Sequence, residues 1–269
     1  SGACVAVLGS TAGVGATTVL IAAARELSSL GQRVLAIDGN LARPALCQRL
    51  GLSAAAGIGD VLAGHRRLCE ATVPAPFGAA LLGSVTTPPH IDPAARQRFA
   101  AELHAARERF DAVLIDLAAG LSPWSDWLCR RTANVLLVTT PRADDVRAAY
   151  TTVKSFGGEV PTRLAFNRTN DARVADAVAR RIGETAWQFL GRNPLAEAPT
   201  LIPALGDDPL TQAEHRRACR LLAAELIVPS RLVHDRRAAH RSLPSHRAPS
   251  PASSTAASAV AAAPLDRLW

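Results

Sequence analysis

Methionine is absent from this sequence of 269 residues, even at the first position, so we expect that its start has been trimmed. Lysine is nearly absent as well, because Lys154 is the only one. Apolar runs of roughly eighteen residues, which a transmembrane helix needs, do not occur. The first residues, Ser1-Gly2-Ala3, lack the basic start of a signal peptide. These absences predict a cytoplasmic protein.

Cysteine occurs without the spacing of a structural site. The five cysteines are widely separated, and no C-x-x-C pair is present. Their number and spacing argue against a disulfide framework or a zinc site, and they favour a reducing compartment. The net charge of +7 permits contact with nucleic acid or anionic lipid without demonstrating either. An arginine-rich composition with a basic tail is the simpler explanation.

Short apolar runs alternate with longer helical segments along most of the chain. Near-continuous apolar runs of this length are typical of parallel strands covered on both faces. We predict strands at 3–8, 33–38, 79–83, 111–116, 133–139, 161–167 and, less regularly, 200–203. We predict helices at 15–30, 43–50, 93–110, 143–156, 171–190 and 208–226. This alternation indicates an α/β fold with a mostly parallel sheet.

The composition changes after about residue 229. The segment 231–247 is basic, and the segment 248–264 consists almost entirely of alanine, serine and proline. Such a composition cannot bury enough apolar surface to become ordered. We therefore predict one domain over residues 1–228 and a disordered C-terminal tail over residues 229–269.

A glycine-rich loop follows the first predicted strand, with the sequence G-S-T-A-G-V-G-A-T-T from Gly9. A Walker A loop reads G-x-x-x-x-G-K-[ST], in which backbone N–H groups and a lysine hold phosphates and a hydroxyl holds Mg²⁺. Ser10 takes the place of the first glycine and Ala16 the place of the lysine. An ordinary glycine-rich turn is the alternative. The positions that fit the motif are Gly13, Gly15, Thr17 and Thr18.

Polar residues end three of the other predicted strands. Asp38 ends the second, Asp116 the fourth and Asn167 the sixth. Ligands of open parallel sheets bind outside the carboxyl ends of the strands. Either aspartate alone could be a helix N-cap or part of a loop salt bridge. Both aspartates together, beside the glycine-rich loop, favour a nucleotide site.

Five segments together resemble the MinD/ParA family of deviant P-loop ATPases. They are T-A-G-V-G-A-T-T, A-I-D-G-N-L-A-R-P-A-L-C-Q-R-L-G-L, V-L-I-D-L-A-A-G-L-S, L-L-V-T-T-P and F-N-R, in this order over residues 3–168. Within the family, D-L-A-A-G-L-S and T-T-P-R-A-D-D-V-R-A-A-Y-T-T-V-K look most like the flagellar-number regulators (the FlhG/FleN/YlxH branch). The resemblance implies a single three-layer P-loop NTPase domain of the MinD type (SIMIBI class).

The resemblance also implies ATP and Mg²⁺ as cofactors. Thr17 would ligate Mg²⁺, together with Asp116 as the Walker B acid, and Thr18 would contact the α-phosphate. The phosphates would lie against the backbone N–H groups of Gly13, Val14, Gly15 and Ala16.

Three further residues receive a role from the resemblance. Asp38 would position the attacking water, which makes Asp38 and Asp116 the candidate catalytic residues. Asn167 would read the edge of adenine, and Arg168 would lie beside the base.

Two positions depart from the family in a way that matters for catalysis. The family has a signature lysine at the position of Thr11, which reaches the phosphates of a dimer partner, and the Walker lysine at the position of Ala16. Loss of one preorganised cation costs about 3 kcal/mol, or on the order of 10²-fold in rate. Backbone donors at the helix N-terminus remain, so we expect nucleotide binding with impaired hydrolysis.

These features predict an ATP-binding regulator that controls flagellar number or placement, or another positioning process. We expect its protein partner to be a flagellar or positioning factor. We expect a homodimer to be weak, because Thr11 cannot bridge to a partner. An active ATPase and a DNA-associated partition protein are alternatives. A polysaccharide tyrosine kinase is disfavoured, because Tyr150 is the only tyrosine. The basic tail and the final Leu265, Leu268 and Trp269 leave open a weak peripheral contact with the inner face of a membrane.

Two tryptophans follow the fourth predicted strand in the segment S-P-W-S-D-W. Trp124 and Trp127 could pack as part of a helix, or they could form an exposed surface for a partner.

Overall fold

A computed structural model describes residues 1–227 of the chain except 85–90, 133, 192, 194 and 196–197. The strands are β1 (Ala3–Gly9), β2 (Val34–Asp38), β3 (Thr72–Pro74), β4 (Ala80–Leu82), β5 (Ala112–Leu117), β6 (Asn134–Thr139), β7 (Thr162–Asn167) and β8 (Thr200–Ile202). The helices are α1 (Ala16–Ser29), α2 (Leu46–Arg49), α3 (Ile58–Ala63), α4 (Pro93–Arg109), α5 (Pro123–Cys129), α6 (Ala143–Ser155), α7 (Ala172–Leu190) and α8 (Pro209–Ile227), with a 3₁₀ turn at Leu68–Glu70.

The strands form one sheet in the order β3-β4-β2-β5-β1-β6-β7-β8. Neighbouring strands are parallel except β3 and β4, which pair antiparallel. The chain runs from β1 to one side of the sheet first and later, from β6 onward, to the other side. The loop after β1 therefore lies at the point where the strand order reverses, which is where open α/β sheets bind ligands.

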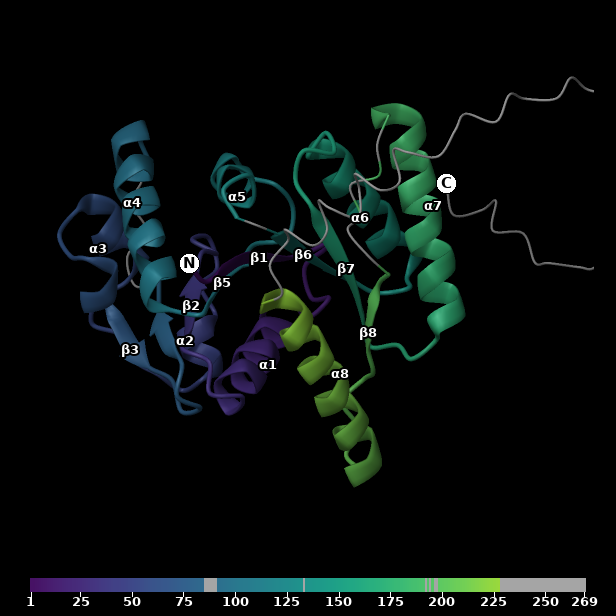
Figure 1. Cartoon of the computed structure of the whole chain (residues 1–269), viewed down its shortest axis with the longest axis horizontal. Helices are drawn as coiled ribbons and strands as arrows, with labels where there is room; N and C mark the ends of the chain where they lie inside the picture. Colours follow the sequence, from purple (N-terminus) through teal and green to yellow (C-terminus); the bar gives the residue numbers. More distant parts are fainter. Residues whose placement is uncertain (85–90, 133, 192, 194, 196–197, 228–269) are drawn as a thin grey trace, which may run out of the picture. The chain divides into compact units, whose positions relative to one another are not determined.

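Alternate residues of the strands enter two cores, one on each face of the sheet. In β1, Cys4, Ala6 and Leu8 face one core, whereas Val5 and Val7 face the other. The first core is covered by α3, α4, α5, α6 and α7, and the second by α1, α2 and α8. Figure 1 shows α1 and α8 side by side on their face of the sheet. This arrangement confirms the predicted three-layer α/β fold with a mostly parallel sheet.

Side-chain caps fix where several helices begin. Asp92 Oδ1 accepts a hydrogen bond from the backbone N–H of Ala95 before α4, and Asp171 Oδ1 accepts two at the start of α7. Ser122 caps α5 and is followed by Pro123, a residue suited to the first helical turn. These caps satisfy N–H groups that have no partner within the helix.

All seven predicted strands are present, as are the six predicted helices, although α2 is shorter than expected. The sequence patterns missed β3, α3 and α5, which are short elements of three to seven residues. Periodicity carries little signal over such lengths, and packing against the sheet decides their conformation. The division at residues 228/229 stays a prediction, because the predicted tail lies outside the described residues. Within the described part of the chain, no helix is both long enough and apolar enough to cross a membrane.

The packing predicts a large difference between two identical substitutions. Phe99 of α4 is fully buried, with its ring centroid 5.5 Å from that of Trp124, whereas Phe189 of α7 is 68% exposed. Phe99→Ala should lower the free energy of unfolding by about 3–5 kcal/mol, and Phe189→Ala by less than about 0.5 kcal/mol. Urea denaturation measures both. Equal losses for the two variants would contradict this assignment of the core.

Candidate functional site

The glycine-rich loop connects β1 to α1 and lines a cavity of about 550 Å³. Gly13 and Gly15 have φ angles of 86° and 94°, a left-handed conformation that favours glycine. Residues 11–18, which include the first three residues of α1, line the cavity. The first N–H groups of α1 therefore lie at the cavity. Because the N-terminal N–H groups of a helix lack internal partners and carry partial positive charge, this geometry suits a phosphate. Arg43, Arg49 and Arg168 also line the cavity.

Thr17 and Asp116 meet beneath the loop. Thr17 Oγ1 donates a hydrogen bond of 2.8 Å to Asp116 Oδ2. Asp116 is fully buried, and its second oxygen, Oδ1, has no hydrogen-bond partner. Burial raises the pKa of the Asp116 carboxyl to about 7, in opposition to the hydrogen bond from Thr17, which lowers it. A buried carboxylate oxygen without a partner beside a threonine hydroxyl fits a Mg²⁺ ion, which prefers oxygen ligands.

Asp38 lies beside Asp116 and is bonded to the segment that leads into α2. The two residues are register partners on β2 and β5, and the charge of Asp38 raises the pKa of Asp116 further. Asp38 is 1% exposed, and its Oδ2 accepts hydrogen bonds from the backbone N–H groups of Ala45 and Leu46 at 2.8 and 2.9 Å. Asp38 therefore holds the start of α2 in this structure. The water-positioning role expected for it stays a prediction.

Asn167 and Arg168, at the end of β7, contact the loop itself. Asn167 Nδ2 donates to the carbonyl oxygen of Val14 at 2.8 Å, and Asn167 Oδ1 accepts from the backbone N–H of Arg168. The Arg168 guanidinium donates to the carbonyl oxygen of Gly13 at 3.1 Å. Both side chains therefore brace the loop from β7. The contacts with adenine expected for them stay predictions.

Thr11, at the position of the signature lysine, is tied to α6. Thr11 Oγ1 donates a 2.5 Å hydrogen bond to Oδ1 of Asp145, a buried residue, whose Oδ2 accepts a short hydrogen bond from Thr140. The side chain is therefore held within its own chain. Asp145 was not among the predicted site residues, because nothing in its local sequence shows that α6 approaches the loop.

The two tryptophans belong mainly to the core. Trp124 is buried, and its Nε1 donates to the carbonyl oxygen of Gly39 at 3.1 Å. The ring of Trp127 stacks on Trp124 with a centroid distance of 5.3 Å, and the Arg131 guanidinium lies 4.3 Å from the centroid of Trp127. These contacts favour helix packing over an exposed partner surface.

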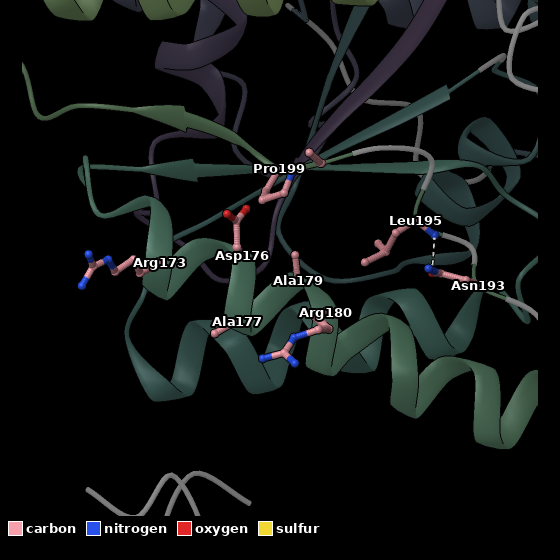
Figure 2. A pocket seen from close by; sticks show the side chains of 9 residues that line it. Arg173, Asp176, Ala177, Ala179, Arg180, Asn193, Leu195 and Pro199 are labelled. Carbon is pink, nitrogen blue, oxygen red and sulfur yellow. Dashed lines mark hydrogen bonds between the residues drawn. The ribbon is translucent and has the colours of Figure 1, made fainter. Parts of the chain in front are cut away.

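A second cavity, of about 620 Å³, lies between α7 and the segment that leads into β8. Figure 2 shows the Asp176 carboxylate pointing toward Pro199 in this cavity. None of the predicted site residues lines it. The cavity beside the glycine-rich loop is therefore the candidate nucleotide site.

The chain is similar in sequence to one curated protein, the antiactivator FleN of Pseudomonas aeruginosa. The two are 26% identical over 207 residues, which cover 72% of this chain and 74% of FleN. No family model matches the chain.

Solved structures show the same fold. The cell division ATPase MinD of Pyrococcus furiosus has a TM-score of 0.63 and 22% identity over 84% of this chain and 98% of that one. The septum site-determining protein MinD of Pyrococcus horikoshii, complexed with Mg-ADP, has a TM-score of 0.64 and 21% identity over 87% and 99%. A ParA family ATPase of Chlorobium tepidum has a TM-score of 0.58 and 18% identity over 87% and 97%. Together these comparisons confirm the resemblance to MinD/ParA ATPases and to the FleN branch.

The contact between the loop and Asn167 predicts unequal effects at two glycines of the same backbone conformation. A Cβ at Gly15 would lie 2.4 Å from Asn167 Nδ2, whereas a Cβ at Gly13 would meet nothing within 4 Å. Both alanine variants incur backbone strain of about 1–2 kcal/mol. Gly15→Ala should cost about 1 kcal/mol more, because it displaces the hydrogen bond between Asn167 and Val14.

Urea denaturation of the two variants, alone and combined with Asn167→Ala, tests this contact. With Asn167→Ala present, the two glycine substitutions should cost the same. Equal costs in the otherwise unmodified chain would show that Asn167 does not brace the loop.

Proposed function

We propose that this chain binds ATP with Mg²⁺ and acts as a regulatory protein. Its fold is similar to that of MinD/ParA ATPases, and its sequence is similar to that of FleN. The observation that carries this proposal is the pairing of Thr17 with Asp116 beneath a glycine-rich loop. Asp116 Oδ1, buried and without a partner, would complete its coordination with Mg²⁺. The N–H groups of residues 13–16 would hold the phosphates at the start of α1.

We further propose that hydrolysis is impaired. Mg²⁺ supplies charge stabilisation at the transferring phosphoryl group when it is bound. The loop itself adds little charge stabilisation at the phosphoryl group, because Thr11 and Ala16 are neutral at the two positions where the family has lysines. Asp38 also accepts hydrogen bonds from the backbone N–H groups of Ala45 and Leu46, and it would have to release them to orient a water molecule.

A regulator with slow turnover would act through nucleotide occupancy. ATP would shift the population between two states of the protein that differ in affinity for a partner. The FleN relative is named as an antiactivator, which supports regulation through a bound protein partner. The resemblance to flagellar-number regulators favours flagellar number or placement, or another positioning process, as what is controlled. An active ATPase of the same family is the second candidate, and the phosphate-release assay described next separates the two.

Mg·ATP binding without efficient turnover is the first expected outcome. Calorimetric titration should detect binding, and phosphate release should be slow. Ala16→Lys places a cation beside the phosphates, so it should raise the affinity or the rate, the latter by on the order of 10²-fold. Asp116→Ala should abolish Mg²⁺-dependent binding and serves as the control. Rapid phosphate release by the unmodified protein would show that hydrolysis is intact.

The second expected outcome concerns association. Thr11 is bonded to Asp145 within its own chain, and its short neutral side chain cannot reach the phosphates of a partner. In a two-fold interface each subunit lacks the lysine–phosphate contact, so the free energy of association loses that contact twice. Light scattering with and without Mg·ATP should therefore show little change in mass. A monomer-to-dimer shift that requires ATP would contradict this expectation.

A further inference from the structure

The cavity beside the glycine-rich loop receives its positive side chains from outside the loop. No loop residue from 9 to 18 is a cation. Lys154, the only lysine, lies on α6 with its ammonium 5.4 Å from the ring centroid of Phe189, and it does not line the cavity. The cations that line it are Arg43, Arg49 and Arg168.

The three arginines differ in what they contact. Arg168 already donates to the carbonyl oxygen of Gly13 and so braces the loop. Arg49 Nη1 donates to Thr18 Oγ1 at 3.3 Å, a long hydrogen bond to an uncharged group. A guanidinium has five N–H donors, and Thr18 engages one of them. Arg49 therefore has donors left to offer to an anion at the start of α1.

Arg49 also lies on the Mg²⁺ side of the loop. Its hydrogen-bond partner, Thr18, follows Thr17 in the first turn of α1, and Arg49, Thr17 and Thr18 all line the cavity. The phosphates of a bound nucleotide are expected here, because the unpaired N–H groups at the start of α1 would hold them and Thr17 and Asp116 would hold Mg²⁺. The Arg49 guanidinium therefore lies beside the expected phosphate position.

The fold holds Arg49 there through buried contacts. Arg49 is the last residue of α2, and Asp38 binds the backbone N–H groups of Ala45 and Leu46 at the start of that helix. Leu46 is fully buried in the core. The exposed Arg49 guanidinium therefore lies at the end of a short helix, α2, whose first residues are held by Asp38 and by the core.

We propose that Arg49 supplies, from α2, the phosphate-binding cation that the glycine-rich loop itself lacks. Its guanidinium, which lies beside Thr18, donates to phosphate oxygens of the nucleotide at the start of α1. This inference rests on the proposed nucleotide function of the same site. Arginine suits the role, because its planar donors match phosphate oxygens and its charge persists at all working pH values.

Calorimetric titration with Mg·ATP compares the unmodified protein with Arg49→Ala and Arg43→Ala. Both residues are exposed and line the cavity, but within the described residues no side-chain hydrogen bond joins Arg43 to the loop, which makes Arg43 the matched control. Arg49→Ala should weaken binding roughly 10- to 100-fold, the loss typical of a charged hydrogen bond. Arg43→Ala should change it less than about 3-fold. Thermal melting should show both variants folded.

A second pair of titrations tests whether the two cations are interchangeable. Ala16→Lys should raise the affinity much more in Arg49→Ala than in the unmodified chain, because it restores the same charge at the same phosphates. Equal gains in both backgrounds would overturn the proposal, as would unchanged binding by Arg49→Ala or equal losses for both arginines. If the unmodified protein binds neither Mg·ATP nor Mg·ADP, the proposed function fails and this inference falls with it.

Discussion

The hydrogen bond between Thr17 and Asp116 joins the glycine-rich loop to the centre of the sheet, and the rest of the site depends on it. Asp116 is a buried carboxylate on β5, and Thr17 lies in the first turn of α1. A buried carboxylate is costly unless its oxygens are satisfied, and one oxygen of Asp116 has no partner. The structure therefore retains, buried beneath the loop, a group that a divalent cation would satisfy.

Around this pair, three residues at positions where the MinD/ParA family has functional groups make structural contacts within the chain. Asp38 holds α2, Thr11 is bonded to Asp145, and Asn167 binds the carbonyl oxygen of Val14. Each contact fixes an element at the carboxyl edge of the sheet to a neighbour. A site held in this way suits binding, since its donors are oriented before the ligand arrives. The proposal of impaired hydrolysis rests on the neutral residues Thr11 and Ala16, since phosphoryl transfer needs cations placed at the transferring group.

The positive side chains of this chain are arginines, apart from the single Lys154, and this determines which cations lie near the loop. The loop contains no lysine or arginine, and the cations near it come from α2, from the segment before α2 and from the residue after β7. A guanidinium on a neighbouring element can donate several hydrogen bonds to phosphates. It cannot adjust to movement of the phosphates as a flexible lysine in the loop can. This arrangement agrees with the proposal that the chain acts through nucleotide occupancy more than through turnover.

The sequence by itself determined the alternation of strands and helices, the carboxyl-edge positions of Asp38, Asp116 and Asn167, and the loop between β1 and α1. These follow from local patterns, because apolar runs and glycine spacing act over a few residues. Only the tertiary structure decided what those side chains bind. The α2 cap by Asp38, the bond from Thr11 to Asp145 and the approach of Arg49 to Thr18 join residues 7 to 134 positions apart. Such contacts depend on strand register and helix packing, which no local pattern encodes.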